Sequence, residues 1–332
     1  MRGASSKALS EPSMRPIEET SEKAKAKEVY CKIIYGDSKE VLPTLDMKAS
    51  LIVTSPPYAD ARRVHYDSIP PDDYARWFAG PEGFSEAFWK VLEPDGNFVL
   101  NIKDKVVDGV RNHFVWKTIQ QLEEKGWKPI DDYLWRKTNP MPGYWHNRLR
   151  DGWEYCFQLA KTNRPKMYQE QVKQPIGGWT EARLANLKGK DLKRQNSANK
   201  SGFGRDLTYW VNKDKVLPSN VILADEPTEA ENVVELPIGV GRQFKHPAVF
   251  PVGLPAFFIR LFTKDGKDGP EDFSDDLVID PFGGSGTTGI AALNLHRNSI
   301  LIDNNKEYCE LAYKRIKAEA NPNGWKVLRE GF

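Results

Sequence analysis

Two stretches of the chain combine residue types that could bind a small molecule and act on it. The first is Ser-Pro-Pro-Tyr at 55–58, which directly follows the apolar run 51–53. The second is a glycine-rich turn at 283–289, which follows an apolar run and precedes a helical pattern. Proline fixes the backbone dihedral φ, so the Ser55 hydroxyl and the Tyr58 ring are held on a stiff loop. A glycine-rich turn before a helix exposes backbone N–H groups to a ligand. The sequence therefore predicts a ligand-binding turn and, separately, a rigid loop that carries polar groups.

The glycine-rich turn formally matches the fingerprint of a dinucleotide-binding site. Gly284, Gly286 and Gly289 satisfy its spacing, and Asp303 follows Gly284 by 19 residues. Two observations argue against a nicotinamide dinucleotide. Asp280 beside the glycines would repel a pyrophosphate and favour a cation such as an ammonium or sulfonium group. Only 29 residues follow Asp303, too few for the remaining strands of a dinucleotide sheet. No lysine follows the glycines as in a P-loop, and a turn that serves packing alone stays an alternative.

Short apolar runs, rich in β-branched residues and bounded by turn residues, predict buried strands. They cover 31–38, 51–58, 96–104, 131–138, 153–161, 276–284 and 298–305. Helical patterns lie between some of them, at 72–92, 113–127, 287–295 and 307–320. This alternation predicts an α/β fold with a mainly parallel sheet. The last two strands cannot form a sheet of their own, so we expect them to pair with strands from the N-terminal half.

Composition limits the kind of protein. Hydrophobic residues make up 39% and charged residues 28% of the 332, which is typical of a globular protein in water. No apolar run approaches the length of a membrane span, so we expect none. Cys31, Cys156 and Cys309 are widely separated and form no CxxC pair, which favours a reduced, intracellular protein. The five histidines show no metal-binding spacing, so we expect no metal site.

The segment 162–240 interrupts the alternation of strands and helices, and we predict an insertion or a small second domain there. Between 161 and 215 lie thirteen Lys/Arg and five Asp/Glu, together with Trp179, Phe203, Tyr209 and Trp210. A basic stretch with interleaved aromatic residues favours contact with nucleic acid. A solvated, charged insertion would explain the same composition.

These stretches together resemble the amino-methylating DNA methyltransferases that use S-adenosylmethionine. "DPFGGSGTT" (280–288) resembles their cofactor motif, "TSPPY" (54–58) their catalytic motif and "LIDNNKEYCELAYKRI" (301–316) their acidic ribose-binding segment. "YGDS" (35–38) resembles the motif whose aspartate approaches the cofactor adenine, and "KHPAVFPVGLPAFFIRLF" (245–262) the helix that leads into the cofactor motif. The catalytic motif precedes the cofactor motif, which is the permuted order of the beta group in this family.

The resemblance implies a circularly permuted Rossmann-like fold, with a mostly parallel seven-stranded sheet and helices on both faces. It implies a catalytic domain in two pieces (29–161 and 241–325) and a target-recognition region (162–240), while the polar and charged composition of 1–28 predicts a flexible leader. It also implies S-adenosyl-L-methionine as cofactor and double-stranded DNA as substrate. The expected cofactor-binding residues are Asp37, Lys245, His246, Pro247, Asp280, Pro281, Phe282, Gly283, Gly284, Gly286, Thr287, Asp303 and Asn304.

The resemblance makes Ser55, Pro56, Pro57 and Tyr58 the expected catalytic residues. An exocyclic base amine is a weak nucleophile because its lone pair is delocalised into the ring. We expect the Ser55 oxygen and the Pro56 carbonyl to accept its hydrogens, so that the lone pair faces the sulfonium methyl. Tyr58 would stack on a base flipped out of the duplex. The cysteines lie outside any Pro-Cys loop, which disfavours carbon-5 cytosine chemistry.

Serine before Pro-Pro-Tyr usually accompanies cytosine N4 methylation in this family, and aspartate accompanies adenine N6 methylation. The sequence therefore favours a site-specific N4-cytosine DNA methyltransferase. An N6-adenine enzyme, an enzyme acting on RNA and an inactive DNA-binding relative remain alternatives. The resemblance also implies a cytoplasmic, nucleoid-associated prokaryotic enzyme, with or without a separate restriction endonuclease. The expected DNA contacts, for which a solvated surface or a packed loop is the alternative, are Arg62, Arg63, Asn139, Trp145, Lys193 and Arg194.

Overall fold

The computed structural model describes residues 29–60, 69–138, 140, 143–177, 182, 193–194, 205–206, 214–223, 250–265, 275–320 and 324–332. The predicted leader (1–28) lies outside these ranges, and so do six of the expected site residues, Arg62, Arg63, Asn139, Lys245, His246 and Pro247. Among the described residues, no helix is both long and apolar enough to cross a membrane.

The described strands form one large sheet of nine strands, with three small two-stranded sheets beside it. Strand β7 runs antiparallel to both of its neighbours, and the other neighbouring pairs in the large sheet are parallel. All the predicted strands are present, and the short edge strands β12 and β15 extend the expected seven to nine. In spatial order the strands are β12 (Val221–Ile222), β6 (Lys128–Arg136), β7 (Trp153–Ala160), β3 (Leu92–Ile102), β2 (Ala49–Thr54), β13 (Leu277–Asp280), β14 (Asn298–Asp303), β1 (Tyr30–Tyr35) and β15 (Lys326–Glu330).

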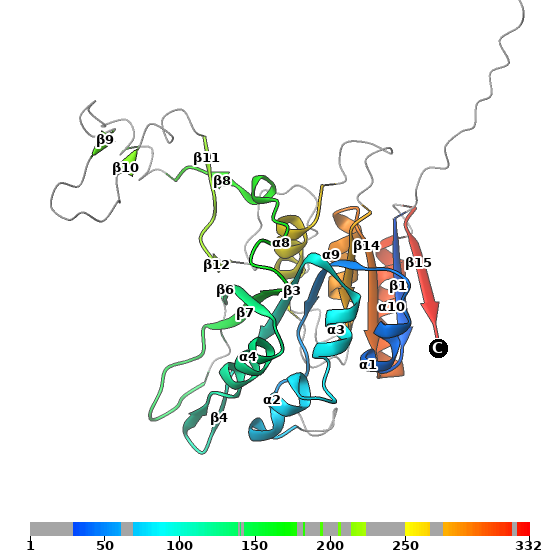
Figure 1. Cartoon of the computed structure of the whole chain (residues 1–332), viewed down its shortest axis with the longest axis horizontal. Coiled ribbons are helices and arrows are strands. Elements are labelled where there is room, and N and C mark those ends of the chain that lie inside the picture. Colours follow the sequence, from blue (N-terminus) through cyan, green and yellow to red (C-terminus); the bar gives the residue numbers. More distant parts are fainter. Residues whose placement is uncertain are drawn as a thin grey trace, which may run out of the picture.

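The two halves of the chain interleave in the middle of this sheet. Strands β13 and β14 come from the C-terminal part, yet they lie between β2 and β1 from the N-terminal part (Figure 1). Ile279 of β13 pairs with Ile52 of β2, and Asp303 of β14 pairs with Tyr35 of β1. The permuted arrangement expected from the motif order is therefore confirmed.

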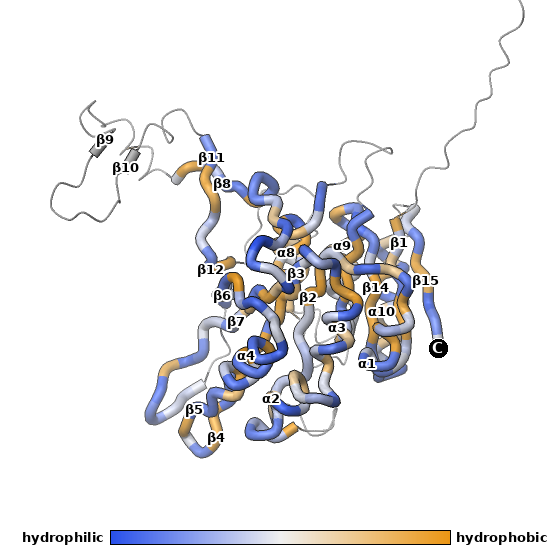
Figure 2. The backbone as a smooth tube through the Cα atoms, viewed as in Figure 1, coloured by the Kyte–Doolittle hydropathy of each residue, from blue (hydrophilic) through white to orange (hydrophobic). Residues whose placement is uncertain are grey.

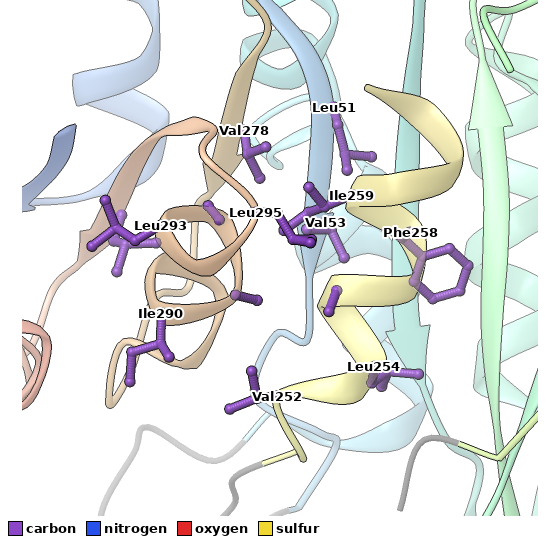
Figure 3. Close-up of a cluster of buried hydrophobic side chains, with 14 of the residues drawn as sticks. Leu51, Val53, Val252, Leu254, Phe258, Ile259, Val278, Ile290, Leu293 and Leu295 are labelled. Carbon is purple, nitrogen blue, oxygen red and sulfur yellow. The ribbon is translucent and has the colours of Figure 1, made fainter. Parts of the chain in front are cut away.

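Helices cover both faces of the sheet. Successive strand residues point to opposite faces, so the apolar central strands present side chains to be buried on each face. Ile52 belongs to one buried cluster, with α2 (Pro71–Ala79), α3 (Ser85–Val91) and α4 (Phe114–Glu124). Leu51 and Val53 belong to the other, with α8 (Gly253–Phe262), α9 (Thr287–Asn294) and α10 (Lys306–Ala320). Figure 2 shows hydrophobic stretches along the central strands, and Figure 3 shows side chains of α8 and α9 gathered with Leu51, Val53 and Val278.

The single helix predicted over 72–92 is in fact two helices. Helix α2 ends at Gly80, and α3 begins at Ser85. A Cβ atom at Gly80 would lie 2.2 Å from the Arg76 carbonyl oxygen, so a larger residue does not fit this close turn. Pro81 follows and cannot donate a helical hydrogen bond. The helical periodicity continues across the turn because both helices bury residues on the same face of the sheet.

Parts of the predicted recognition region (162–240) belong to the catalytic fold. The Tyr168 backbone N–H donates to the Leu261 carbonyl of α8 over 2.7 Å, and β12 pairs with β6 at the edge of the large sheet. These two contacts attach segments after residue 161 to α8 and to the large sheet, and the domain boundary itself stays a prediction. The remaining described elements are α1 (Ser38–Val41), η1 (Leu42–Thr44), β4 (Lys105–Val107), β5 (Val110–Asn112), η2 (Gln169–Val172), β8 (Gln174–Pro175), β9 (Lys193–Arg194), β10 (Arg205–Asp206) and β11 (Lys215–Val216).

Candidate active site

The expected motifs meet at one edge of the sheet. Strands β2, β13, β14 and β1 are mutually parallel, so their carboxyl ends lie together. These ends carry the Ser55 loop, the glycine-rich turn, Asp303 and the segment with Asp37. In Figure 1 this edge is the lower end of the molecule, near α1 and α2. Ligands of α/β proteins bind outside the carboxyl ends of parallel strands, so this edge is the candidate site.

Asp280 joins the two central motifs through its side chain. One carboxylate oxygen accepts from the Thr54 hydroxyl over 2.6 Å, and the other accepts from the Thr288 hydroxyl over 2.6 Å. The Phe282 backbone N–H also donates to it, over 3.1 Å. Asp280 is 2% exposed, and burial raises the pKa of its carboxyl while these hydrogen bonds act to lower it.

These contacts show a structural role for Asp280. Its carboxylate is shielded from solvent, and donors of the chain occupy three of its roughly four acceptor positions. Asp280 thereby fixes the end of β2, one residue before Ser55, against the first turn of α9, and its contact with the cofactor stays a prediction. Thr54 and Thr288, which sequence reasoning did not single out, are its partners.

Asp303 and Asp37 lie side by side at the ends of β14 and β1. The Gly36 N–H donates to the Asp303 carbonyl over 3.0 Å, and the Ser38 hydroxyl donates to the Pro281 carbonyl. These bonds bring the Tyr-Gly-Asp-Ser motif against the glycine-rich turn. The Asp37 side chain is 40% exposed and caps α1 by accepting from the Lys39 N–H.

The Asp303 carboxylate is held by two backbone donors. Gly284 N–H donates to Oδ2 over 2.9 Å, and Asn305 N–H donates to Oδ1 over 2.8 Å. Burial nevertheless raises the pKa of Asp303 to about 6. Each oxygen has a second lone pair, so the carboxylate can accept further donors such as two neighbouring hydroxyl groups. Asn304 beside it is exposed.

The glycine-rich turn is tightly packed. A Cβ atom at Gly283 would lie 2.8 Å from Leu301 Cβ, and Gly286 has a φ of 86°, a conformation that favours glycine. Thr287, an expected cofactor-binding residue, contacts another part of the chain. It is 4% exposed, and its hydroxyl accepts from the Arg315 guanidinium of α10 over 3.0 Å. Its side chain therefore stabilises the start of α9.

Aromatic packing surrounds Phe282, the residue next to the turn. The Phe282 ring lies 4.8 Å from the Phe84 ring between centroids, in an edge-to-face arrangement. Trp77 of α2 lies 6.4 Å away. Phe282 thus connects the turn to the helices on one face of the sheet. Pro281 and Gly283 beside it are buried, whereas Gly284 is half-buried.

The Ser55 loop is held by two tyrosine hydroxyls. The buried Tyr74 of α2 donates to the Pro57 carbonyl over 2.8 Å. The Ser55 hydroxyl donates to the Tyr58 phenol oxygen over 3.2 Å, and Tyr58 donates to Glu154 Oε2 over 2.7 Å. The Tyr58 hydroxyl is therefore an anchored polar group, a feature that the stacking role alone did not predict. Pro56 is buried, and Ser55 and Pro57 are half-buried.

Sequence reasoning missed three residues that surround this loop, namely Asn101, Lys137 and Glu154. Asn101 Oδ1 lies 3.2 Å from the Tyr58 hydroxyl, and Lys137 Nζ lies 2.5 Å from Glu154 Oε1. Burial, with the charge of Glu154, raises the pKa of Tyr58 well above its usual range. A signal was present: Glu154 and Asn101 are polar residues inside otherwise apolar strands, "WEYCFQLA" and "FVLNI".

The expected DNA-contacting residues are only partly described. Trp145 lies in the segment between β6 and β7 and is 38% exposed, with the Arg148 guanidinium 4.3 Å from its ring centroid. Lys193 and Arg194 form β9, which pairs with β10 in a sheet separate from the large one. The basic region is thus not brought against the Ser55 loop by any described contact.

The cysteines are buried and suit no nucleophilic role. Burial raises the pKa of Cys31 and of Cys309 to about 12, and it raises the pKa of Cys156 further. All three thiols are free of disulfides and stay protonated near neutral pH. Within the described ranges, no group of three or more His, Cys, Asp and Glu residues is arranged to hold a metal ion.

The donor set at this edge fits an adenosyl ligand that carries hydroxyl groups. Half-buried Asp303 has lone pairs left for ribose hydroxyls, and Asp37 lies beside it with a partly exposed carboxylate. Gly284 has a φ of 49° and lacks a side chain, so its backbone can approach a ligand closely. The glycine-rich turn, Asp303 and the Ser55 loop therefore form one continuous edge.

Comparisons with known proteins agree with this geometry. A family model described as DNA methylase matches residues 49–314. The type II methyltransferase M.PvuII of Proteus hauseri is 29% identical over 287 residues, which cover 82% of this chain and 80% of that protein. The orphan methyltransferase M.BamHII of Bacillus amyloliquefaciens is 28% identical over 280 residues, which cover 82% and 90%.

Solved structures share the fold. The PvuII DNA methyltransferase (cytosine-N4-specific) superposes with a TM-score of 0.59 at 24% identity, covering 91% of this chain and 97% of that chain. TTHA0409 of Thermus thermophilus, solved in complex with S-adenosyl-L-methionine, has a TM-score of 0.53 at 20% identity, with coverage of 90% and 98%. Because the family model spans most of the sequence, including both motifs at the sheet edge, the chain belongs to the DNA methylase family.

Proposed function

We propose that this protein transfers a methyl group from S-adenosyl-L-methionine to the N4 nitrogen of a flipped cytosine at specific sites in double-stranded DNA. The observation that carries the proposal is the Asp280 carboxylate, which joins Thr54 of the catalytic strand to Thr288 of the glycine-turn helix. This bridge holds the Ser55 loop and the glycine-rich turn side by side. The relationship to M.PvuII supports cytosine N4 as the acceptor.

The proposed roles follow from the positions of the side chains. Asp303 and Asp37 orient the adenosyl moiety through hydrogen bonds, and the bound cofactor supplies an activated methyl group on a sulfonium. The Ser55 oxygen and the Pro56 carbonyl accept the two N–H groups of the base amine. Acceptors fixed in advance localise the nitrogen lone pair in the direction of transfer and cost no reorganisation. Two prolines and the Tyr74 hydroxyl keep the loop in place.

Replacing Ser55 tests the acceptor role. We expect Ser55→Ala to lower the rate of methyl transfer by about 10²-fold, the cost of removing one preorganised polar partner. Cofactor affinity should stay within about twofold, because Ser55 lies in the loop after β2 and not on the glycine-rich turn. The measurement is transfer of tritium from labelled cofactor to duplex DNA, together with a cofactor titration.

Ser50→Ala is the matched control for this variant. Ser50 lies on β2 at the end away from the Ser55 loop, where its hydroxyl donates to Asp276 over 2.7 Å. The control should transfer methyl groups at a near-normal rate when folded. A Ser55→Ala protein that also transfers at the wild-type rate would contradict the acceptor role.

The modified base is identified by mass spectrometry of nucleosides from DNA methylated by the protein. N4-methylcytosine is the expected product. N6-methyladenine in its place would overturn the choice of base while keeping the reaction class. Binding of DNA without transfer of label, over a broad range of sequences, would instead indicate an inactive DNA-binding relative.

We further propose that the protein acts on cytoplasmic DNA and that its product resists an endonuclease with the same recognition sequence. The type II name of M.PvuII supports a restriction-modification role. Plasmid DNA from cells that express the chain should resist at least one endonuclease in a broad panel. Sequencing that maps modified bases would give the recognition site, and plasmid cleaved by every enzyme despite mapped methylation would argue for a solitary methyltransferase.

A further inference from the structure

A continuous line of hydrogen bonds runs from Ser55 to Glu154. Ser55 donates to the Tyr58 oxygen over 3.2 Å, and Tyr58 donates to Glu154 Oε2 over 2.7 Å. Lys137 Nζ contacts Glu154 Oε1 at 2.5 Å, with side-chain exposures of 26% for Lys137 and 8% for Glu154. Each hydroxyl donates towards Glu154, so a proton that reaches Ser55 has an ordered route to a carboxylate.

The groups that face Glu154 leave it as the proton acceptor of this cluster. They come from separate elements: Asn101 lies on β3, Lys137 follows β6, Cys156 lies on β7, and Tyr58 lies in the loop after β2. Burial raises the pKa of Tyr58 and of Cys156, so both keep their protons near neutral pH. Asn101 is a neutral amide, and Lys137 carries the positive charge that pairs with the carboxylate.

Methylation of an amine requires the loss of one proton. When the nitrogen lone pair bonds to the methyl carbon, the carbon–sulfur bond breaks and its electron pair stays on sulfur. The nitrogen then holds one proton more than the neutral product. A positioned acceptor of this proton accelerates such a step by about 10²–10⁴-fold.

We propose that Ser55, Tyr58 and Glu154 form a relay that removes this proton, an inference that rests on the function proposed above. The base N–H bond breaks with its electrons left on nitrogen, and the proton passes to Ser55 Oγ. The Ser55 proton passes to the Tyr58 oxygen, and the Tyr58 proton passes to Glu154 Oε2. The products are a neutral methylated amine, a neutral thioether and a protonated Glu154. Lys137, which is partly exposed, contacts the other carboxylate oxygen, Glu154 Oε1.

A hydroxyl of α2 contacts the loop from outside the relay. Tyr74 donates to the Pro57 carbonyl over 2.8 Å and is fully buried. Tyr74→Phe therefore removes a phenol hydroxyl that contacts the same loop, as Tyr58→Phe does, without interrupting the line to Glu154. It is the matched control for a role that is merely structural.

The test compares Glu154→Gln, Tyr58→Phe and their double variant with Tyr74→Phe and the wild type. Single-turnover transfer of labelled methyl to duplex DNA is measured in H₂O, in D₂O and in mixtures. Affinity for S-adenosyl-L-methionine, affinity for duplex DNA and thermal stability are measured on the same preparations. Glutamine keeps the size of Glu154 and a carbonyl acceptor but cannot take up a proton.

We expect Glu154→Gln and Tyr58→Phe each to lower the rate by about 10²-fold, with both affinities retained. The double variant should be no slower than the slower single variant, because the residues act as a unit. For the wild type and Tyr74→Phe, a plot of the transfer rate against the D₂O fraction should be curved. For Tyr58→Phe the same plot should be linear.

Two results would overturn the relay. The first is a wild-type rate in Glu154→Gln or Tyr58→Phe. The second is a rate loss that Tyr74→Phe shares, with an isotope effect unchanged in every variant, which would assign the cluster a structural role. Failure of the proposed function is a separate result, because it would be seen as absence of transfer to DNA by the wild type.

Discussion

Three aspartates at the carboxyl edge of the sheet have the same side chain but different surroundings. Asp37 is partly exposed and caps α1, whereas Asp280 is buried and accepts from two hydroxyls and one backbone N–H. Asp303 is held by two backbone N–H groups, yet its pKa rises to about 6. Residue type alone therefore does not assign a role, because burial and the number of remaining lone pairs decide which carboxylate can still accept a ligand.

The raised pKa of Asp303 predicts a pH dependence of cofactor binding. An acid whose pKa is raised on folding stabilises the free protein at low pH, and this contribution is lost as the pH rises from 3.8 through about 6. Hydroxyl donors of the ligand favour the carboxylate and lower its pKa in the complex. Binding near pH 6 should therefore release a proton, and affinity should rise with pH and level off above this range.

Titration calorimetry in buffers of different ionisation enthalpy measures this proton release. Asp303→Asn cannot titrate, so it should bind more weakly and show little pH dependence through the same range. Proton uptake on binding, or an equal pH dependence in Asp303→Asn, would show that Asp303 does not accept hydrogen bonds from the ligand.

At the scale of elements, the site depends on the hydrogen bonds through Asp280 that join β2 to α9, called the joint below. Thr54 ends β2, Thr288 lies in the first turn of α9, and their hydroxyls meet on Asp280 at the end of β13. Three elements are thus fixed by one buried carboxylate. A similar contact stands at the opposite end of the same strands, where Asp276 accepts from Ser50 and from the Lys264 N–H.

Removing this joint should affect both halves of the site. We expect Asp280→Ala to lower the free energy of unfolding by about 2–5 kcal/mol, because two buried hydroxyls and a backbone N–H lose their acceptor. The folded protein should also lose cofactor affinity and transfer rate together, since the Ser55 loop and α9 are no longer tied. Denaturant unfolding, cofactor titration and label transfer measure the three effects.

Asp276→Ala is the control at the other end of the strands. It should also be destabilised, but its folded fraction should keep the affinity and the rate of the wild type. If Asp280→Ala behaved in the same way, the joint would contribute stability alone, and the coupling between the two motifs would have another origin.

At the scale of the whole molecule, the fold depends on strands from both ends of the chain. β13 and β14 occupy the middle of the sheet between β2 and β1, so neither half contains a complete core. Without them, the facing edges of β2 and β1 would be unpaired and the apolar side chains of both clusters would lose their neighbours. The site likewise combines residues from both parts of the chain, at the ends of β2, β13, β14 and β1.

A chain cut between residues 235 and 236 should therefore fold only when both pieces are present. Each fragment alone should show no cooperative thermal unfolding, and co-expressed fragments should co-purify and recover cofactor binding. Circular dichroism melts and cofactor titration make the comparison. An N-terminal fragment that melts cooperatively and binds the cofactor alone would contradict the interleaved core.

The sequence by itself determined the elements and their class. Short apolar runs rich in β-branched residues marked the seven central strands, and the Ser-Pro-Pro-Tyr and glycine-rich stretches marked the strand ends that carry chemistry. The order of the two motifs, catalytic before cofactor, already implied through the family resemblance that β13 and β14 join N-terminal strands. These features are local or follow from motif order, so they can be read without coordinates. The break at Gly80 within one helical pattern shows the limit of periodicity, since both helices share a buried face.

Only the tertiary structure decided which polar atoms meet. Thr54 and Asp280 are 226 residues apart, and Tyr58 and Glu154 are 96 apart. A sequence pattern indicates the face of a strand on which a residue lies, but not the neighbour that the sheet order places opposite it. A hydrogen bond forms only when the distance between donor and acceptor falls within a window of a few tenths of an ångström. For that reason the contacts of Asp280, the raised pKa of Asp303 and the line from Ser55 to Glu154 became visible only in the folded chain.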